Sequence, residues 1–193
     1  MNERRLNVVA ELLDLVDPLA LSVIRERLRS GKALDEGIAR RISRFDDMSA
    51  LASTKVVNLA NIGAANYEFL SKLVVVERLI LSGSRITDIS PIANLARLKH
   101  IDLSNTMITD IEGLNKCTGL ETINLSYTPV EDVKELVALP NVRMLAIMGT
   151  DVDELPKTLL SKLQKVYTNS NELRRSLPKE KLMEPAQALR VFG

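Results

Sequence analysis

The stretch Leu98-Lys99-His100-Ile101-Asp102-Leu103-Ser104-Asn105-Thr106-Met107-Ile108 decides the fold, because its pattern returns every 22 residues along the chain. Apolar side chains stand at its first, fourth, sixth and eleventh positions. The same columns are apolar in the stretches that begin at Val76, Leu120 and Val142. A fixed period in this range predicts a solenoid, in which each unit buries its apolar face against its neighbours.

Two further units extend this register to six rungs, over about residues 53–173. A degenerate unit comes first, with Val57, Leu59 and Ala64 in the apolar columns. After the loss of one residue, a last unit follows with Leu163, Val166, Thr168, Asn171 and Leu173.

Each unit predicts a strand, a loop and a short helical turn. Alternating residues such as Leu79 and Leu81 favour a strand with one buried face, and Ile86 then re-enters the core. A short apolar-periodic stretch follows, and an aspartate precedes it in three successive units. This carboxylate can accept backbone N–H groups at the start of a helical turn. The three aspartates are Asp88, Asp110 and Asp132.

These columns resemble the leucine-rich repeat, whose core reads L-x-x-L-x-L-x-x-N-x-L. The 22-residue period and the Ile-Thr-Asp-Ile segments at 86–89 and 108–111 are similar to those of internalins and of leucine-rich regulatory subunits of protein phosphatase one. The resemblance implies an α/β fold: a right-handed solenoid of about six rungs, with short parallel strands on its concave face and helical caps at both ends.

One column departs from the family pattern. Only Asn171 keeps the asparagine whose amide joins neighbouring turns in the family. Hydroxyl groups can donate and accept, so we expect them to form a shortened version of that ladder. The residues in this column are Ser84, Thr106, Thr128 and Thr150.

The predicted organisation has three parts. Residues 1–52 read as a helical N-terminal cap, residues 53–173 as the solenoid, and residues 174–193 as a C-terminal cap or tail. At the C-terminal end, four leucines are expected to cover the final rung. They are Leu173, Leu177, Leu182 and Leu189.

Composition disfavours several classes of binding partner and bears on the expected location. The formal net charge is +1, which disfavours nucleic acid and anionic membranes as partners. The basic segment 25–44 reads as a solvated helix face, with nucleic-acid binding as the weaker alternative. No apolar run is long enough to span a membrane. Because Cys117 is the only cysteine, no intramolecular disulfide can form, and we expect a cytoplasmic location.

Candidate partner-binding residues lie on the strand face that points away from the core. Charge gathers in its early rungs and apolar side chains in its late rungs, a mixture that suits a protein interface. The alternative is that the small residues of these columns only satisfy strand packing. We expect this concave face to be free for docking. The candidates are Arg78, Ile80, His100, Asp102, Asn124, Met144, Met148 and Tyr167.

The sequence predicts no catalytic, cofactor or metal site. His100 and Asp102 share one strand face, and a surface ion pair is favoured there over a catalytic pair. Cys117 occupies an apolar column and reads as a buried small hydrophobe. One histidine and one cysteine cannot supply a structural zinc site.

The leading hypothesis is a non-catalytic protein-interaction module that binds a protein partner through its concave face. One alternative is a structural protein that forms homo-oligomers through its N-terminal helices. Another is a regulatory subunit of an enzyme such as a phosphatase, which only the family resemblance implies.

Overall fold

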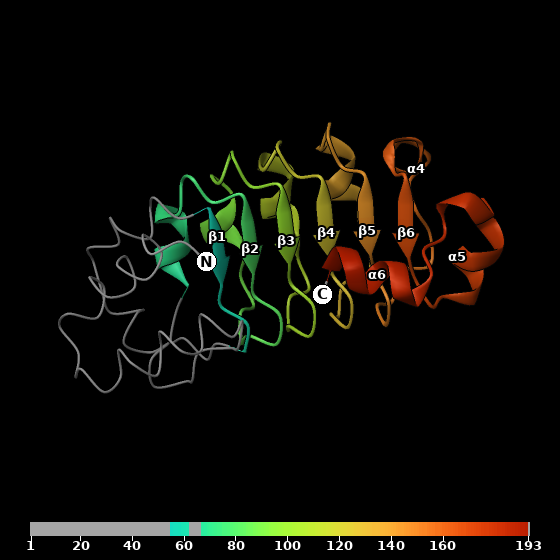
Figure 1. Ribbon diagram of the computed structural model, residues 1–193, viewed down its shortest axis with the longest axis horizontal. Helices are drawn as coiled ribbons and strands as arrows, with labels where there is room; N and C mark the ends of the chain where they lie inside the picture. Colours follow the sequence, from blue (N-terminus) through green and yellow to red (C-terminus); the bar gives the residue numbers. More distant parts are fainter. Residues whose placement is uncertain (1–54, 62–66, 193) are drawn as a thin grey trace.

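The computed structural model describes residues 55–61 and 67–192, and within them six parallel strands form one sheet in chain order (Figure 1). The predicted N-terminal cap and its oligomerisation surface lie outside the described residues. The strands are β1 (Val56–Asn58), β2 (Arg78–Ile80), β3 (His100–Asp102), β4 (Thr122–Asn124), β5 (Met144–Ala146) and β6 (Lys165–Tyr167).

The central residue of every strand belongs to one continuous interior row. Leu79, Ile101, Ile123 and Leu145 are partners in adjacent strands, and each is at most 2% exposed. The row continues to Val57 at one end and Val166 at the other. This arrangement confirms the register and the six rungs that the sequence predicted.

Backbone hydrogen bonds join the rungs beyond the three residues of each strand. The amide of Leu81 donates to the carbonyl of Asp102 at 2.8 Å, and the amide of Leu103 donates to Asn124 at 2.9 Å. Further amide bonds of this kind join all six rungs. The backbone is therefore paired over a longer stretch than the strands themselves.

Short helical turns cover the other side of the sheet and complete the core (Figure 1). Their inward residues, such as Leu114 and Leu136, are fully buried in the same cluster as the strand residues. The turns are η2 (Glu68–Lys72), η3 (Ser90–Ile92), η4 (Glu112–Lys116) and η5 (Lys134–Ala138), all 3₁₀ helices, and α4 (Lys157–Lys162).

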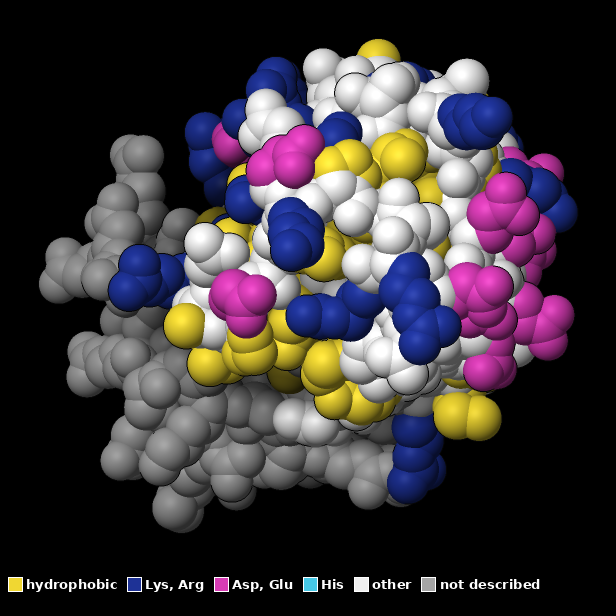
Figure 2. Space-filling view, turned by 90° about the vertical axis from the view of Figure 1, so that its right-hand side faces the viewer, with side chains coloured by type: hydrophobic (Ala, Val, Ile, Leu, Met, Phe, Trp, Pro, Cys, Tyr) yellow, Lys and Arg dark blue, Asp and Glu magenta, His cyan; other side chains and the backbone are white. Residues whose placement is uncertain are grey.

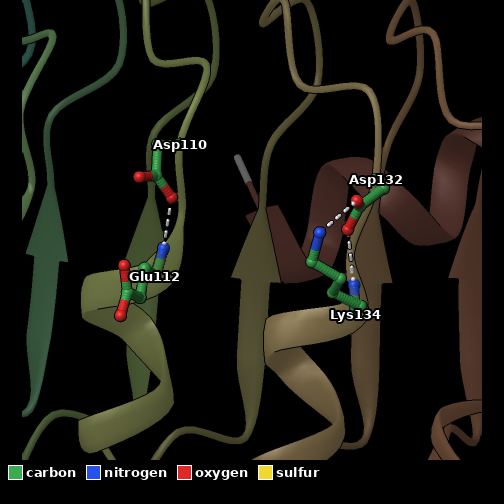
Figure 3. Close-up of polar contacts among 4 residues, drawn as sticks. All are labelled: Asp110, Glu112, Asp132 and Lys134. Carbon is green, nitrogen blue, oxygen red and sulfur yellow. Dashed lines mark hydrogen bonds and ion pairs between the residues drawn. The ribbon is translucent and has the colours of Figure 1, made fainter.

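The recurring aspartates start these turns as predicted. Oδ1 of Asp110 accepts the amide of Glu112 at 2.8 Å, and Oδ1 of Asp132 accepts that of Lys134 at 2.9 Å (Figure 3). Asp88 accepts the amide of Ser90 in the same way, at 2.8 Å. This backbone hydrogen bond is the main reason why the pKa of Asp88 lies below its ordinary value.

The hydroxyl column bonds within each rung and not between rungs. Oγ1 of Thr106 donates to the carbonyl of Leu103, and Oγ1 of Thr128 donates to that of Leu125, both at 2.6 Å. Oγ of Ser84 is buried with no hydrogen-bond partner in the described part of the chain. The hydroxyl groups of this column therefore do not form the expected ladder of hydrogen bonds between neighbouring turns. The reason is that a hydroxyl three residues after a carbonyl lies within reach of it.

A second column holds the left-handed turns that follow the strands. Each of its residues has a φ between 55° and 68°. Glycine and asparagine adopt this conformation readily, whereas tyrosine rarely does. The column consists of Asn61, Gly83, Asn105, Tyr127 and Gly149.

The C-terminal segment closes the last rung. Leu173 and Leu177, at α5 (Asn171–Ser176), are buried as predicted. After η6 (Lys179–Lys181), the amide of Met183 donates to the carbonyl of Val166 at 2.8 Å and covers the edge of β6. Viewed from this end, apolar side chains are interrupted by charged and other polar groups (Figure 2). The cap thus replaces an open apolar end by a mixed surface.

Candidate protein-interaction surface

The predicted binding residues lie on one face of the sheet. The concave face consists of the strand side chains that point away from the core. The strand register places them in two rows. One row is Val56, Arg78, His100, Thr122, Met144 and Lys165, and the other is Asn58, Ile80, Asp102, Asn124, Ala146 and Tyr167.

The last helix of the chain, α6 (Pro185–Phe192), crosses this face in front of the C-terminal strands (Figure 1). Val191 and Phe192 share a cavity with Arg78, Ile80, His100 and Asp102. Leu189 and Phe192 share a larger cavity with Asp102, Asn124, Met148 and Tyr167. Every predicted binding residue except Met144 therefore borders α6.

Two expectations from the sequence are wrong here. The concave face is not free, because α6 lies on it, and Leu189 does not cover the final rung, because 72% of it is exposed. The physical reason is the spacing of apolar residues in α6. Ala188, Val191 and Phe192 fall on one helical face, and this face turns to the sheet.

The expected ion pair between His100 and Asp102 does not form. Oδ1 of Asp102 accepts the amide of Ser104 at 2.9 Å, while Nδ1 of His100 is buried without a hydrogen-bond partner in the described chain. Burial is the largest cause that lowers the pKa of His100, and the charge of Arg78 adds to it. Burial also raises the pKa of Asp102, against the opposing hydrogen bonds from Ser104.

One oxygen of each asparagine and aspartate side chain in these two rows accepts a hydrogen bond from its own turn. Oδ1 of Asn58 accepts the amide of Ala60 at 3.0 Å, and Oδ1 of Asn124 accepts that of Ser126 at 3.1 Å. Asp102 makes the same bond to Ser104. The face can therefore be covered by apolar groups without leaving these oxygens unpaired.

Tyr127 was not among the predicted binding residues, although the structure places it at this surface. It is 51% exposed and borders the larger cavity beside α6. Its ring lies against Gly149, where an added Cβ would stand 2.6 Å from the ring atom Cδ1. The sequence signal was a bulky aromatic residue in a column whose other members are asparagine or glycine.

A row of alternating charge precedes the strands. Glu77 forms ion pairs with Lys55 at 2.8 Å and with Lys99 at 2.9 Å. The hydrogen bonds from these two lysines lower the pKa of Glu77 to about 2. Glu121 and Arg143 continue the alternation in the next two rungs. The early part of the concave face thus has a charged border.

Cys117 is a buried hydrophobe, as the sequence predicted. Its Sγ donates to the carbonyl of Ile92 at 3.2 Å, and burial raises the pKa of the thiol to about 11. Among the described residues, no three His, Cys, Asp or Glu side chains are grouped to hold a metal ion. In the same part of the chain, no helix has the length and apolar character needed to cross a membrane.

Comparison with known proteins agrees with this geometry. In-register rungs of one strand and one helical turn define a solenoid repeat protein. The family described as Leucine Rich repeats (2 copies) matches residues 75–116 and 96–141. The chain is therefore a leucine-rich repeat protein. No curated protein matches the sequence.

Solved structures with the same fold are distant in sequence. An internalin of Listeria monocytogenes (InlF) is 22% identical with a TM-score of 0.54, over 71% of this chain and 44% of that one. Internalin C2 of the same organism is 20% identical with a TM-score of 0.57, over 86% of both chains. A leucine-rich repeat protein of Leptospira interrogans is 19% identical with a TM-score of 0.55, over 70% and 40%. The matched region thus spans less than half of the first and third structures.

Proposed function

We propose that this leucine-rich repeat protein is a non-catalytic interaction module that binds a protein partner through its concave face. The observation that supports the proposal is a cluster of partly exposed aromatic and thioether side chains beside a charged border. Tyr127, Met148 and Tyr167 form the cluster, and the row that contains Glu77 forms the border. Such anchors beside a polar rim are typical of protein interfaces.

The chemistry of the face also favours binding over catalysis. The only histidine, His100, and its neighbour Asp102 are not hydrogen-bonded to each other, and Asp102 is engaged by Ser104. A general base needs a partner that orients it, and Asp102 does not take that role here. Oligomerisation through residues 1–52 and a role as a regulatory subunit stay predictions from the sequence.

The size of the face limits how a partner can dock. Six strands at a spacing of about 4.8 Å extend over about 24 Å. A standard interface needs about 800 Å² per partner, which would take most of this surface. The partner must therefore contact the region of α6 as well as the early rungs.

Site-specific crosslinking tests the proposal. We place benzoylphenylalanine at Tyr167 on the concave face and, as a matched control, at Asn94, an exposed residue after η3 on the opposite side. We expect a crosslinked partner from position 167 only, because the reactive ring points into the interface there. Crosslinks from position 94 with none from position 167 would reject the concave face as the binding surface.

A further inference from the structure

We infer that α6 is a displaceable occupant of the concave face, and that the partner presents an amphipathic helix that takes its place. This inference rests on the proposed function and deepens it, since it specifies the class of partner and how access to the site is controlled. Four features of the C-terminal segment carry it.

First, the solenoid is already closed before α6 begins. Leu173, Leu177 and Met183 are buried at the end of the core, and Met183 is bonded to β6. Nζ of Lys181 donates to the carbonyls of Leu160 at 2.7 Å and Leu163 at 2.6 Å, which ties the segment to the end of α4. Release of α6 would therefore leave the cap in place.

Second, α6 is joined to this cap by one residue. Glu184 lies between the bonded Met183 and the first helical residue, Pro185. Pro185 has a fixed φ and restricts Glu184, whose carbonyl accepts the amides of Gln187 and Ala188, so Glu184 would move together with the helix. Rotation about the backbone bonds between Met183 and Glu184 would then carry α6 off the sheet as one unit. Because the change is confined to one junction, it need not disturb β6.

Third, α6 holds the face only through apolar contacts. Among the described residues, no hydrogen bond or ion pair joins residues 185–192 to the strands. The hydrogen bonds of the helix in this part of the chain join it only to itself and to Glu184. Ala188 is 5% exposed, whereas Val191 and Phe192 are only partly buried. By contrast, the cap segment before it makes several hydrogen bonds to the solenoid.

Fourth, α6 is short and leaves space beside it. A helix of eight residues is not stable alone in water, so its folding depends on docking. An open cavity of about 340 Å³ remains next to Leu189, Tyr127 and Tyr167. A longer partner helix can fill this space.

These contacts define the chemistry of the partner helix. It needs a small residue where Ala188 lies near Ala146 and Ser126, and apolar or aromatic residues three and four positions later. A further large apolar side chain would enter the cavity beside Tyr127. Oδ1 of Asn124 and Oδ1 of Asp102 are already bonded to their own turns, whereas Nδ1 of His100 is unpaired in the described part of the chain and could bond a polar group of the partner.

A competition experiment on the full chain tests this inference. The probe is a fluorescent peptide with the sequence of residues 184–192, stapled through positions 186 and 190, both of which are exposed in α6. We measure its binding to the native chain, to Ala188→Glu and to Gln187→Glu. The last variant adds the same charge at an exposed position and serves as the matched control.

We expect Ala188→Glu to bind the peptide at least tenfold more tightly than the native chain and the control, because a buried charge releases α6. A peptide that carries the same Ala188→Glu change should not bind. Equal affinity for all three proteins, or no binding to any, would overturn the inference. A native chain that dimerises through exchange of α6 would overturn it as well.

Hydrogen exchange on the native chain gives a second readout that needs no variant. We expect the amides of α6 to exchange well before those of α5 and β6. Exchange of all three at one common rate would contradict the inference. If crosslinking at position 167 succeeds while the peptide assay fails, only the displacement of α6 is rejected. If the peptide assay succeeds while crosslinks form at position 94 and none at position 167, the proposed function is rejected.

Discussion

At the scale of single residues, Tyr127 combines an unfavourable backbone conformation with an exposed aromatic ring. Its φ of 59° is one that Asn61 and Asn105 adopt in other rungs. For a residue with a bulky side chain this conformation costs about 1–2 kcal/mol. Backbone strain of this kind is often kept where a side chain is needed for binding.

We therefore expect Tyr127→Asn to raise the free energy of unfolding by about 1 kcal/mol. The stabilisation that the ring gains by packing on Gly149 would be subtracted from this increase. The same variant should bind the partner more weakly. Urea unfolding and affinity measurements check the two effects. A clear loss of stability would mean that the ring is mainly a packing element.

The hydroxyl column gives a second prediction at this scale. Ser84 buries a hydroxyl without a partner, whereas the hydroxyl of Thr106 donates to Leu103. Ser84→Ala should be neutral or stabilising by up to about 1 kcal/mol, and Thr106→Val should destabilise by about 1 kcal/mol. Chemical unfolding of the two variants compares them directly. Equal losses in both would contradict the hydrogen bonding described above.

His100 gives a prediction about pH. Burial, and then the charge of Arg78, lower the pKa of His100 in the folded chain below the ordinary value of 6.5, and the charges of Glu121 and Glu77 only partly oppose this. The folded state therefore favours the neutral ring. Stability is complete above the unfolded pKa and is lost as the pH falls through it toward the folded pKa.

An NMR titration of the His100 ring should give a midpoint below 6.5, and His100→Gln should remove part of the loss of thermal stability that occurs as the pH falls through the unfolded pKa of histidine. A midpoint at or above 6.5 would contradict the buried environment. Asp102 changes stability in the opposite direction. Because its pKa is raised in the folded chain, its ionisation destabilises the fold as the pH rises, and protonation at lower pH removes this cost.

The residue patterns that the sequence predicted correctly were the apolar columns, because burial of one strand face requires a strict spacing. The partners of Thr106 and Ser84 were not predictable in the same way. A hydroxyl can choose among several nearby carbonyls, and its choice depends on local distances. The missing ion pair between His100 and Asp102 has a similar cause, since Asp102 instead accepts the amide of Ser104 in its own turn.

At the scale of elements, the aspartate turns are predicted to stabilise the 3₁₀ helices. Asp110→Ala removes the acceptor of the Glu112 amide and should cost about 0.5–2 kcal/mol. Asp151→Ala is the control, since Asp151 is exposed and no hydrogen bond of its side chain is found in the described chain. Thermal unfolding of the two variants measures the difference. Equal effects would show that the carboxylate of Asp110 contributes nothing at the turn.

The elements differ in how completely the sequence predicts their secondary structure and the surface that they cover. Each strand and helical turn of the solenoid follows from its position in the repeat. The segment 185–192 has an amphipathic pattern too, but such a pattern does not say which surface the helix will cover. From the sequence alone, this helix could pack either on the end of the core or on the concave face. Because Leu182 and Met183 already cover the edge of β6, the helix takes the concave face.

At the scale of the whole molecule, the rungs share one core and cannot fold separately. Each rung contacts only its neighbours, and the interior row runs without a break from Val57 to Val166. The stacked core leaves one sheet face without core packing, and the chain's own C-terminal helix lies over part of it. Binding and the position of α6 are therefore expected to be coupled.

Hydrogen exchange of the full chain, with and without the partner recovered by crosslinking, tests this account most directly. We predict slower exchange for the amides of residues 78–82, 100–104 and 122–126, which line the concave face. The amides of α6 should exchange faster in the same complex. Protection of η3 and η4 on the opposite side, with no change on the concave face or in α6, would contradict the account.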